Sequence, residues 1–171
     1  GHRAASIGTL GVTTADESVS TGLTTPDIVT FLANMSGLAR EGVTHVAYEA
    51  SSHGLAQFRN EGLVVAAGGF TNLSRDHLDY HKTMEDYFAA KMRLFDEVVA
   101  ADGTAVIWAD DEWSDPAIRH AEKRGLKLFT VGAKGSAIRL LDRRPGQLGQ
   151  ELDLVYDGVA RTVKLPLIGA Y

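Results

Sequence analysis

The chain contains no cysteine among its 171 residues, which excludes disulfide bonds, thiolate metal sites and a cysteine nucleophile. It also lacks a signal peptide and any apolar run long enough to span a membrane. Positive charge is in deficit, since the formal net charge is -5, and a general nucleic-acid-binding surface is therefore disfavoured. We expect a cytoplasmic protein that binds neither nucleic acid nor membrane.

Two catalytic motifs are also missing. Gly132-Ala-Lys-Gly-Ser136 resembles a phosphate-binding P-loop only in composition, because it lacks the Gly-x-x-x-x-Gly-Lys-Ser/Thr spacing and precedes no helical pattern. Ser51 and His53 are close in sequence, but no Gly-x-Ser-x-Gly elbow surrounds the serine. A serine nucleophile is therefore disfavoured.

The remaining composition is that of a globular protein, with 44% hydrophobic and 23% charged residues. Strand-like and helix-like segments alternate through residues 1–131, which predicts an α/β fold with a doubly wound, mainly parallel sheet and helices on both faces. Helical patterns end there. Residues 137–171 are expected to form a small antiparallel β meander, with turns at Pro145-Gly146 and Asp157-Gly158.

The stretch from Phe70 to Lys91 holds the densest group of ionisable side chains. It crosses a short polar segment that includes His77 and His81, and it enters a helix for which Thr83 is a good N-cap. Lys91 interrupts the apolar stripe of that helix. Such a lysine either extends its charged end to solvent or is held inside for a purpose.

Further polar candidates lie where predicted elements begin or end. Thr24 and Thr25 precede a helix, with Thr25 expected as N-cap and Pro26 at the first helical position, and they either cap the helix or also hold an anion. Glu49 lies at the C-terminal end of a strand in the expected parallel sheet. In such folds, ligands bind beyond the carboxyl ends of the strands. A polar turn follows, and its candidates for anionic or amide groups are Ser51, His53, Gln57 and Arg59.

These segments together resemble the Mur ligase family. The resemblance is carried by Thr24-Thr-Pro-Asp27, Glu49-Ala-Ser-Ser-His-Gly-Leu55, Gln57-Phe-Arg59 and Thr71-Asn-Leu-Ser-Arg-Asp-His-Leu-Asp-Tyr-His81, continuing to Lys91. It is strongest from Thr24 to Lys91 and only topological after Val131. It is closest to the branch that adds the third residue to UDP-N-acetylmuramoyl-L-alanyl-D-glutamate.

The resemblance implies most of a central, ATP-binding domain, with the P-loop expected before Gly1 and a C-terminal domain after Tyr171. It implies an ATP-dependent acid–amino acid ligase of peptidoglycan synthesis, which builds the cell wall on which cell shape and division depend. Its substrates would be ATP, the UDP-muramoyl dipeptide and an amino acid, diaminopimelate being favoured over lysine. We expect a monomer, and we expect this piece alone to be inactive.

The resemblance also assigns roles to individual residues. Thr24, Thr25, Ser51, Gln57 and Arg59 would bind the UDP-muramoyl dipeptide. The metal ligands of Mg²⁺ would be Glu49, His77 and Lys91, and the catalytic residues His77 and Lys91. Lys91 would act as N6-carboxylysine, in which carbamylation turns a cation into an anionic oxygen ligand of the kind that magnesium prefers.

Three alternatives remain open. Another Mur ligase or a folylpolyglutamate synthetase would share the metal-binding residues. A metal-dependent hydrolase built on His53, His77 and His81 would belong to a different class and should retain zinc. A binding module without catalysis predicts that no residue of this cluster matters for turnover by the full-length protein.

Overall fold

The computed structural model describes residues 1–20 and 22–167, and the chain divides into two compact units. The first unit comprises Gly1–Val64 and Arg75–Val98, and the second comprises Val65–Ser74 and Val99–Tyr171. Each unit is described by itself below. No helix in the described ranges is long and apolar enough to cross a membrane.

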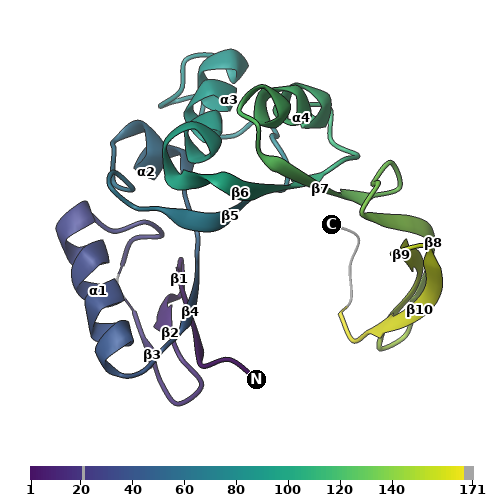
Figure 1. The fold of residues 1–171 in the computed structure, drawn as a ribbon, viewed down its shortest axis with the longest axis horizontal. Coiled ribbons are helices and arrows are strands. Elements are labelled where there is room, and N and C mark those ends of the chain that lie inside the picture. The colour runs from purple at the N-terminus through teal and green to yellow at the C-terminus, as the bar shows by residue number, and fades with distance from the viewer. Residues whose placement is uncertain (21, 168–171) are drawn as a thin grey trace. The chain divides into compact units, whose positions relative to one another are not determined.

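The first unit contains a four-stranded sheet in the order β3-β2-β1-β4. Its strands are β1 (Ala4–Gly8), β2 (Gly11–Thr13), β3 (Ser18–Val19) and β4 (His45–Tyr48). β1 and β4 are parallel, with Ile7 opposite Tyr48, whereas β1, β2 and β3 are joined by antiparallel pairing. Helix α1 (Ile28–Arg40) lies alongside this sheet and buries Phe31 and Leu38 (Figure 1).

Helix α1 begins later than the sequence predicts. Its N-cap is Asp27, whose carboxylate accepts the backbone N–H groups of Val29 and Thr30, each at 3.0 Å. The prediction of Thr25 as N-cap is therefore wrong. A carboxylate caps a helix end as well as a hydroxyl does, and the Thr25 hydroxyl is bonded elsewhere, as described below.

The remaining helices of the first unit are α2 (Ser52–Ala56), α3 (Met84–Arg93) and a π-helical turn, η1 (Leu94–Val98). Thr83 caps α3 by accepting the Asp86 N–H at 3.0 Å, as predicted. Helices α2 and α3 contact each other. The apolar stripe predicted from Lys91's neighbours consists of Met84, Tyr87, Phe88, Phe95 and Val98. It is largely confirmed, because Tyr87, Phe95 and Val98 are buried and the other two are half-buried.

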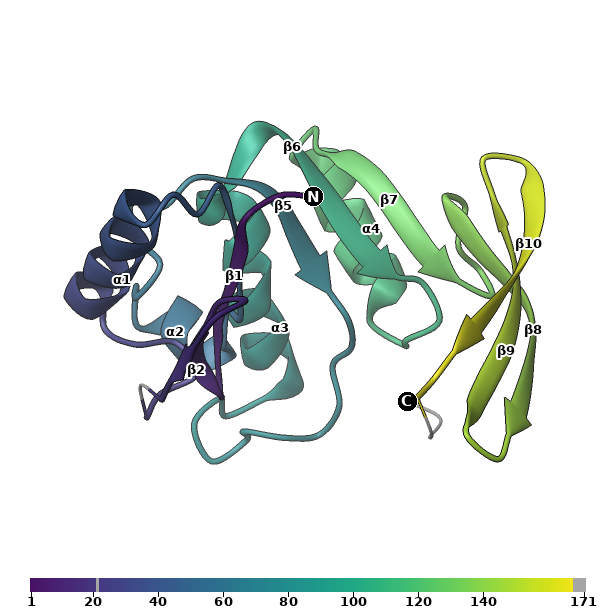
Figure 2. The same ribbon diagram turned by 90° about the horizontal axis from the view of Figure 1, so that it is seen from below.

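The second unit is built on a six-stranded sheet in the order β10-β9-β8-β7-β6-β5 (Figure 2). Its first strands are β5 (Val65–Phe70), β6 (Val99–Trp108) and β7 (Lys127–Gly132). These strands and the start of the next one pair in parallel. Helix α4 (Ser114–Lys123) contacts β6 and β7, and its buried Ala117 and Ala121 allow close packing.

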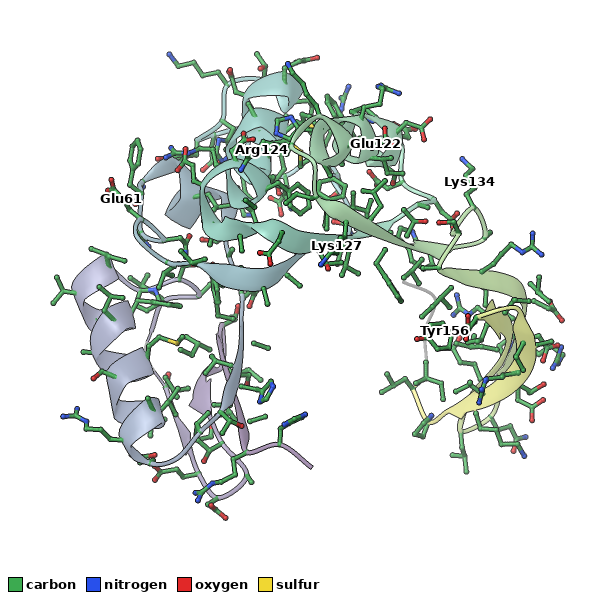
Figure 3. All side chains as sticks on the ribbon, viewed as in Figure 1. Glu61, Glu122, Arg124, Lys127, Lys134 and Tyr156 are labelled. Carbon is green, nitrogen blue, oxygen red and sulfur yellow. The ribbon has the colours of Figure 1, made fainter. Side chains whose placement is uncertain are left out.

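The sheet continues into an antiparallel meander of β8 (Ile138–Gly146), β9 (Gly149–Tyr156) and β10 (Val159–Leu165). The predicted turn at Asp157-Gly158 is confirmed. The other turn lies two residues beyond its predicted place, because Pro145 and Gly146 still pair with Gln150 and Gly149. A hollow of about 640 Å³ lies between the β7–β8 loop and the β9–β10 turn, with Tyr156 on its wall (Figure 3).

The mixed α/β class, the mostly parallel sheet and the antiparallel strands near the C-terminus are thus confirmed. The strands form two hydrogen-bonded sheets, whereas the sequence pattern predicts one doubly wound sheet with an attached meander. The alternation of strands and helices is the same in both arrangements, so it cannot reveal how the strands are shared between sheets. The division of the chain into an α/β part, residues 1–131, and a β meander, residues 137–171, is based on the expected change from parallel to antiparallel strands. It stays a prediction.

Tyr48 offers a test of packing in the first unit. Its ring meets Phe31 edge to face at 5.0 Å, but its buried hydroxyl has no hydrogen-bond partner among the described residues. Burial raises its pKa to about 12. Tyr48→Phe should keep the ring contact and remove the unsatisfied hydroxyl, and so raise the free energy of unfolding by roughly 1 kcal/mol. Urea denaturation of the full-length variant would detect this, and a loss of stability would contradict it.

Candidate functional site

All of the predicted site residues lie in the first compact unit. They come from the strand ends of its sheet, from α2 and α3, and from the loop that precedes α3. The structure arranges them in two groups. One surrounds Glu49 and Thr25, and the other surrounds His53 and Tyr87.

Glu49 lies just beyond the carboxyl end of β4, next to the end of the parallel strand β1. Its Oε2 accepts the backbone N–H of Thr9 at 3.2 Å and the Thr9 hydroxyl at 3.1 Å. The Thr9 hydroxyl also lies 3.0 Å from that of Thr24. A Cβ added to Gly8 would meet Oε2 at 2.9 Å, so a larger residue there would displace the Glu49 carboxylate from its present position.

Thr9 is a site residue that the sequence analysis missed. It follows a short strand and belongs to none of the motifs that carry the family resemblance. Its position could have been found from strand order alone, because β1 and β4 are parallel neighbours and their carboxyl ends therefore meet at one edge.

Thr25 orders the backbone around Glu49. It is only 1% exposed, its hydroxyl donates to the Glu49 carbonyl at 2.8 Å, and the same oxygen accepts the Ser51 N–H at 3.0 Å. The Thr25 carbonyl accepts Nη1 of Arg59 at 2.8 Å. A Cβ at Gly54 would meet the Thr25 side chain at 2.9 Å, so glycine permits this approach. The hydroxyl and the carbonyl of Thr25 thus both form hydrogen bonds within the protein.

The turn after β4 brings Ser51, Gln57 and Arg59 around α2. Ser51 is the N-cap of α2, and its hydroxyl accepts the Gly54 N–H at 3.0 Å. Arg59 donates through Nη2 to Gln57 at 2.5 Å, and the Gln57 amide donates to the Tyr80 hydroxyl at 3.1 Å. This chain of polar groups joins Thr25 to the loop that carries His77.

The second group is a cluster of rings, which we call the His–Tyr cluster. It consists of His53, His77, Tyr80, His81 and Tyr87. The ring of His53 is central, with its centroid 4.9 Å from that of His77, 4.2 Å from that of Tyr80 and 5.4 Å from that of His81. The cluster joins α2, the loop that precedes α3, and α3 itself.

His77 has a left-handed backbone conformation, with φ of 55°. Asp76 stabilises it, since its carboxylate accepts the His77 N–H at 2.8 Å and lies 3.6 Å from the ring Nε2. The side chain of His77 is 44% exposed and so remains open to a ligand. A non-glycine residue in this conformation costs free energy that the surrounding contacts must supply, a situation common at functional sites.

His81, in contrast, is 5% exposed and its Nε2 lies 2.9 Å from the Ser52 hydroxyl. Its ring stacks on Tyr87 with centroids 5.0 Å apart and planes 13° apart. Burial lowers the pKa of His81, and the neighbouring His53 and His77 lower it further. The neutral imidazole is therefore favoured.

Lys91 is half-buried on α3, and its Nζ lies 5.2 Å from the centroid of the Tyr87 ring. The same ring is 5.9 Å from that of His77. Burial, followed by the charge of Asp76, raises the pKa of the Tyr87 hydroxyl. Tyr87 is thus a neighbour of both predicted catalytic residues, and Lys91 turns toward the His–Tyr cluster.

The donor set suits magnesium only in part. Within residues 1–20 and 22–167, no three histidine, aspartate or glutamate side chains lie close enough together to hold a metal ion. The chain offers one carboxylate at Glu49 and an open imidazole at His77. Magnesium usually binds one or two carboxylates and completes its shell with water and substrate phosphates. The Glu49 carboxylate is the type of protein ligand that such a shell needs, although the structure places it in a different group from His77 and Lys91. A carbamate on Lys91 would add another oxygen donor.

Comparisons with known proteins show what the chain as a whole is similar to. Residues 2–171 match the family described as the Mur ligase middle domain. The chain is 59% identical over its whole length to a UDP-N-acetylmuramoyl-L-alanyl-D-glutamate--2,6-diaminopimelate ligase of Zymomonas mobilis, and 50% identical to the protein of the same name from Agrobacterium fabrum. In both cases it spans 35% of the relative.

The solved structures point the same way. A structure of a ligase of that name superposes with a TM-score of 0.86 at 33% identity, covering 98% of this chain and 34% of that one. A folylpolyglutamate synthetase of L. casei gives a TM-score of 0.70 over 99% of this chain and 48% of its own, but at 11% identity it shows the fold alone. On the family match and these identities, the chain belongs to the Mur ligase family, as its middle domain.

Proposed function

We propose that this chain is the central, ATP-binding part of a cytoplasmic ligase that adds meso-diaminopimelate to UDP-N-acetylmuramoyl-L-alanyl-D-glutamate in peptidoglycan synthesis. The observation that carries the proposal is the 59% identity, over the whole chain, to a relative with that name. Since the chain spans only 35% of that relative, the proposal concerns a full-length protein that contains this domain.

The proposed reaction has two steps. An oxygen of the dipeptide's free carboxylate attacks the γ-phosphorus of ATP, ADP leaves, and an acyl phosphate forms. The amino group of diaminopimelate then attacks the acyl carbon, the amide bond forms, and phosphate and a proton are released. Several anionic groups must meet, so the site must supply positive charge and N–H donors.

The groups around Thr25 suit the dipeptide substrate. Arg59 supplies a guanidinium that is held in place by Thr25 and Gln57, and charge-assisted bonds from such a group are strong. We propose that Thr24, Ser51 and Gln57 offer polar contacts beside it. Thr25 would act chiefly by ordering the backbone, because its own hydroxyl and carbonyl are already bonded.

The predicted metal ligands are Glu49, His77 and carbamylated Lys91, and each keeps that role in the proposal. A bound Mg²⁺ would neutralise the phosphate oxygens during transfer. Thr9 fixes the Glu49 carboxylate through two hydrogen bonds, and Asp76 fixes the His77 backbone. These contacts hold both groups in place before substrate arrives.

Arg59→Ala in the full-length protein should raise the KM for the UDP-muramoyl dipeptide much more than the KM for ATP. A charge-assisted contact is worth roughly 1.5–3 kcal/mol, which corresponds to about a 10- to 150-fold increase in KM. Arg40→Ala, at the exposed end of α1, is the matched control. An unchanged KM for the nucleotide sugar would remove Arg59 from the substrate site.

The proposed activity is tested by mass spectrometry of reaction products. The full-length protein is incubated with ATP, Mg²⁺ and the UDP-muramoyl dipeptide, with diaminopimelate, lysine or no amino acid added. We expect a new amide product with diaminopimelate and ADP formation that depends on the dipeptide. Product with lysine instead would change the substrate, and no product with either would reject the ligase.

The alternatives separate in the same assay. A folylpolyglutamate synthetase would extend a folate with glutamate and ignore the dipeptide. A zinc hydrolase would retain zinc after purification. The described side chains contain no group of three histidine, aspartate or glutamate residues that could hold the zinc ion. A binding module would bind the dipeptide without consuming ATP.

A further inference from the structure

His81 is a buried polar residue that the proposed reaction leaves without a role. Both His81 and its partner Ser52 are 5% exposed, so their hydrogen bond lies inside the protein. A buried polar side chain is costly unless it is bonded. The position of this pair suggests which structural role offsets the free-energy cost of burying it.

His81 contacts two helices that are separate from it in sequence. Its Nε2 reaches Ser52 at the start of α2, and its ring stacks on Tyr87 of α3. Its centroid also lies 4.8 Å from that of Tyr80 and 5.4 Å from that of His53. Through these contacts the end of the loop is fastened to both helices.

The same contacts constrain His77. The His77 carbonyl accepts the backbone N–H groups of Tyr80 at 3.1 Å and His81 at 2.8 Å, which closes residues 77–81 into one turn. Fixing His81 therefore fixes this turn. Tyr87, on which His81 stacks, lies against the His77 ring on one side and carries the Lys91 Nζ over its face.

We propose that His81 is a positioning residue that fastens the His77 turn and the Tyr87 ring to α2, and so sets His77 relative to Lys91. This inference rests on the proposed ligase function, in which His77 and Lys91 act together. His81 itself need not touch substrate, ATP or metal.

The contacts require a ring that also bears a hydrogen-bonding nitrogen. Phenylalanine could stack on Tyr87 but would leave the buried Ser52 hydroxyl without this partner. Glutamine could reach Ser52 but could not stack. The variants His81→Phe, His81→Gln and Ser52→Ala therefore separate the two contacts, and His45→Phe on exposed β4 is a matched control.

The first measurement is backbone hydrogen exchange in the full-length protein. We expect residues 76–81 to exchange about tenfold faster in His81→Phe and in Ser52→Ala, since losing a hydrogen bond costs enough for about that change. His45→Phe should leave this segment unchanged. Equal exchange in wild type, His81→Phe and Ser52→Ala would overturn the inference, whether or not the protein proves to be a ligase.

The second measurement is turnover. We expect kcat to fall about tenfold in His81→Phe, while the KM for ATP stays within about twofold. Ser52→Ala combined with His81→Phe should cost no more than His81→Phe alone, because both remove the same bond. A multiplicative loss in the double variant, or an unchanged kcat in both single variants, would contradict positioning. If wild type forms no amide product, the proposed function fails. The hydrogen-exchange result would still show whether His81 holds the His77 turn against α2.

Discussion

Lys91→Ala in the full-length protein is expected to reduce kcat by on the order of 10²–10³-fold, the loss typical of removing one electrostatic stabiliser. The expectation rests on the half-buried position of Lys91, whose Nζ lies over the Tyr87 ring next to His77. A carbamate at this nitrogen would turn the side chain into an anionic oxygen donor. Alanine removes both the amine and the possibility of that adduct.

Chemical rescue separates a carbamate from an ordinary lysine. Formate or acetate should restore part of the activity of Lys91→Ala by placing a carboxylate in the vacated position. Lys91→Arg should stay inactive, because arginine keeps its positive charge and forms no such adduct. Lys82→Ala is the matched control, since Lys82 is an exposed lysine in the loop before α3, and this variant should retain full activity. An active Lys91→Arg protein would refute the carbamate.

Glu49→Gln is expected to lower kcat by about 10²-fold and to raise the concentration of Mg²⁺ needed for half-maximal rate. Glutamine has nearly the same shape, and its carbonyl oxygen can still accept the two Thr9 bonds, so the fold should remain intact. His77→Ala should shift the magnesium requirement in the same direction.

A magnesium titration of the initial rate tests this assignment. Glu61→Gln is the matched control, since Glu61 is an exposed carboxylate in the loop after α2 (Figure 3). If Glu49→Gln titrates with magnesium like wild type, Glu49 is not a metal ligand. Circular dichroism of each variant should match wild type and so exclude unfolding as the cause of lost activity.

Much of the fold could be predicted because it depends on local patterns. Thr83 caps α3 as expected, and the strand segments follow apolar runs. One prediction failed because of a long-range contact. Thr25 does not cap α1, because its hydroxyl bridges Glu49 and Ser51, and Asp27 takes the cap instead. Local N-cap preference already ranks aspartate above threonine, so Asp27 was a candidate from the sequence, whereas the bonds of Thr25 to Glu49 and Ser51 depend on the tertiary structure.

The candidate site shows the same division. Positions at predicted element ends and on the helical stripe, together with the family resemblance, identified Glu49, His77 and Lys91 as candidates, but they could not identify the residues that support them. Thr9 and Tyr80 reach the site only through strand order and loop folding, and each is distant in sequence from the residue it contacts. The supporting contacts depend on tertiary structure, whereas the motifs can be read along the chain.

The interleaving of the two compact units has a consequence for synthesis on the ribosome. The chain leaves the first unit at residue 65, returns at residue 75 and leaves again at residue 99. Strand β5 therefore emerges before β6, the strand with which it pairs at the edge of its sheet. Until residues 99–108 have been translated, the backbone N–H and C=O groups of β5 lack the β6 strand with which they pair in the finished sheet, and a strand without its partner is prone to aggregation. The interval between the synthesis of β5 and that of β6 is therefore one in which a chaperone would protect the nascent domain.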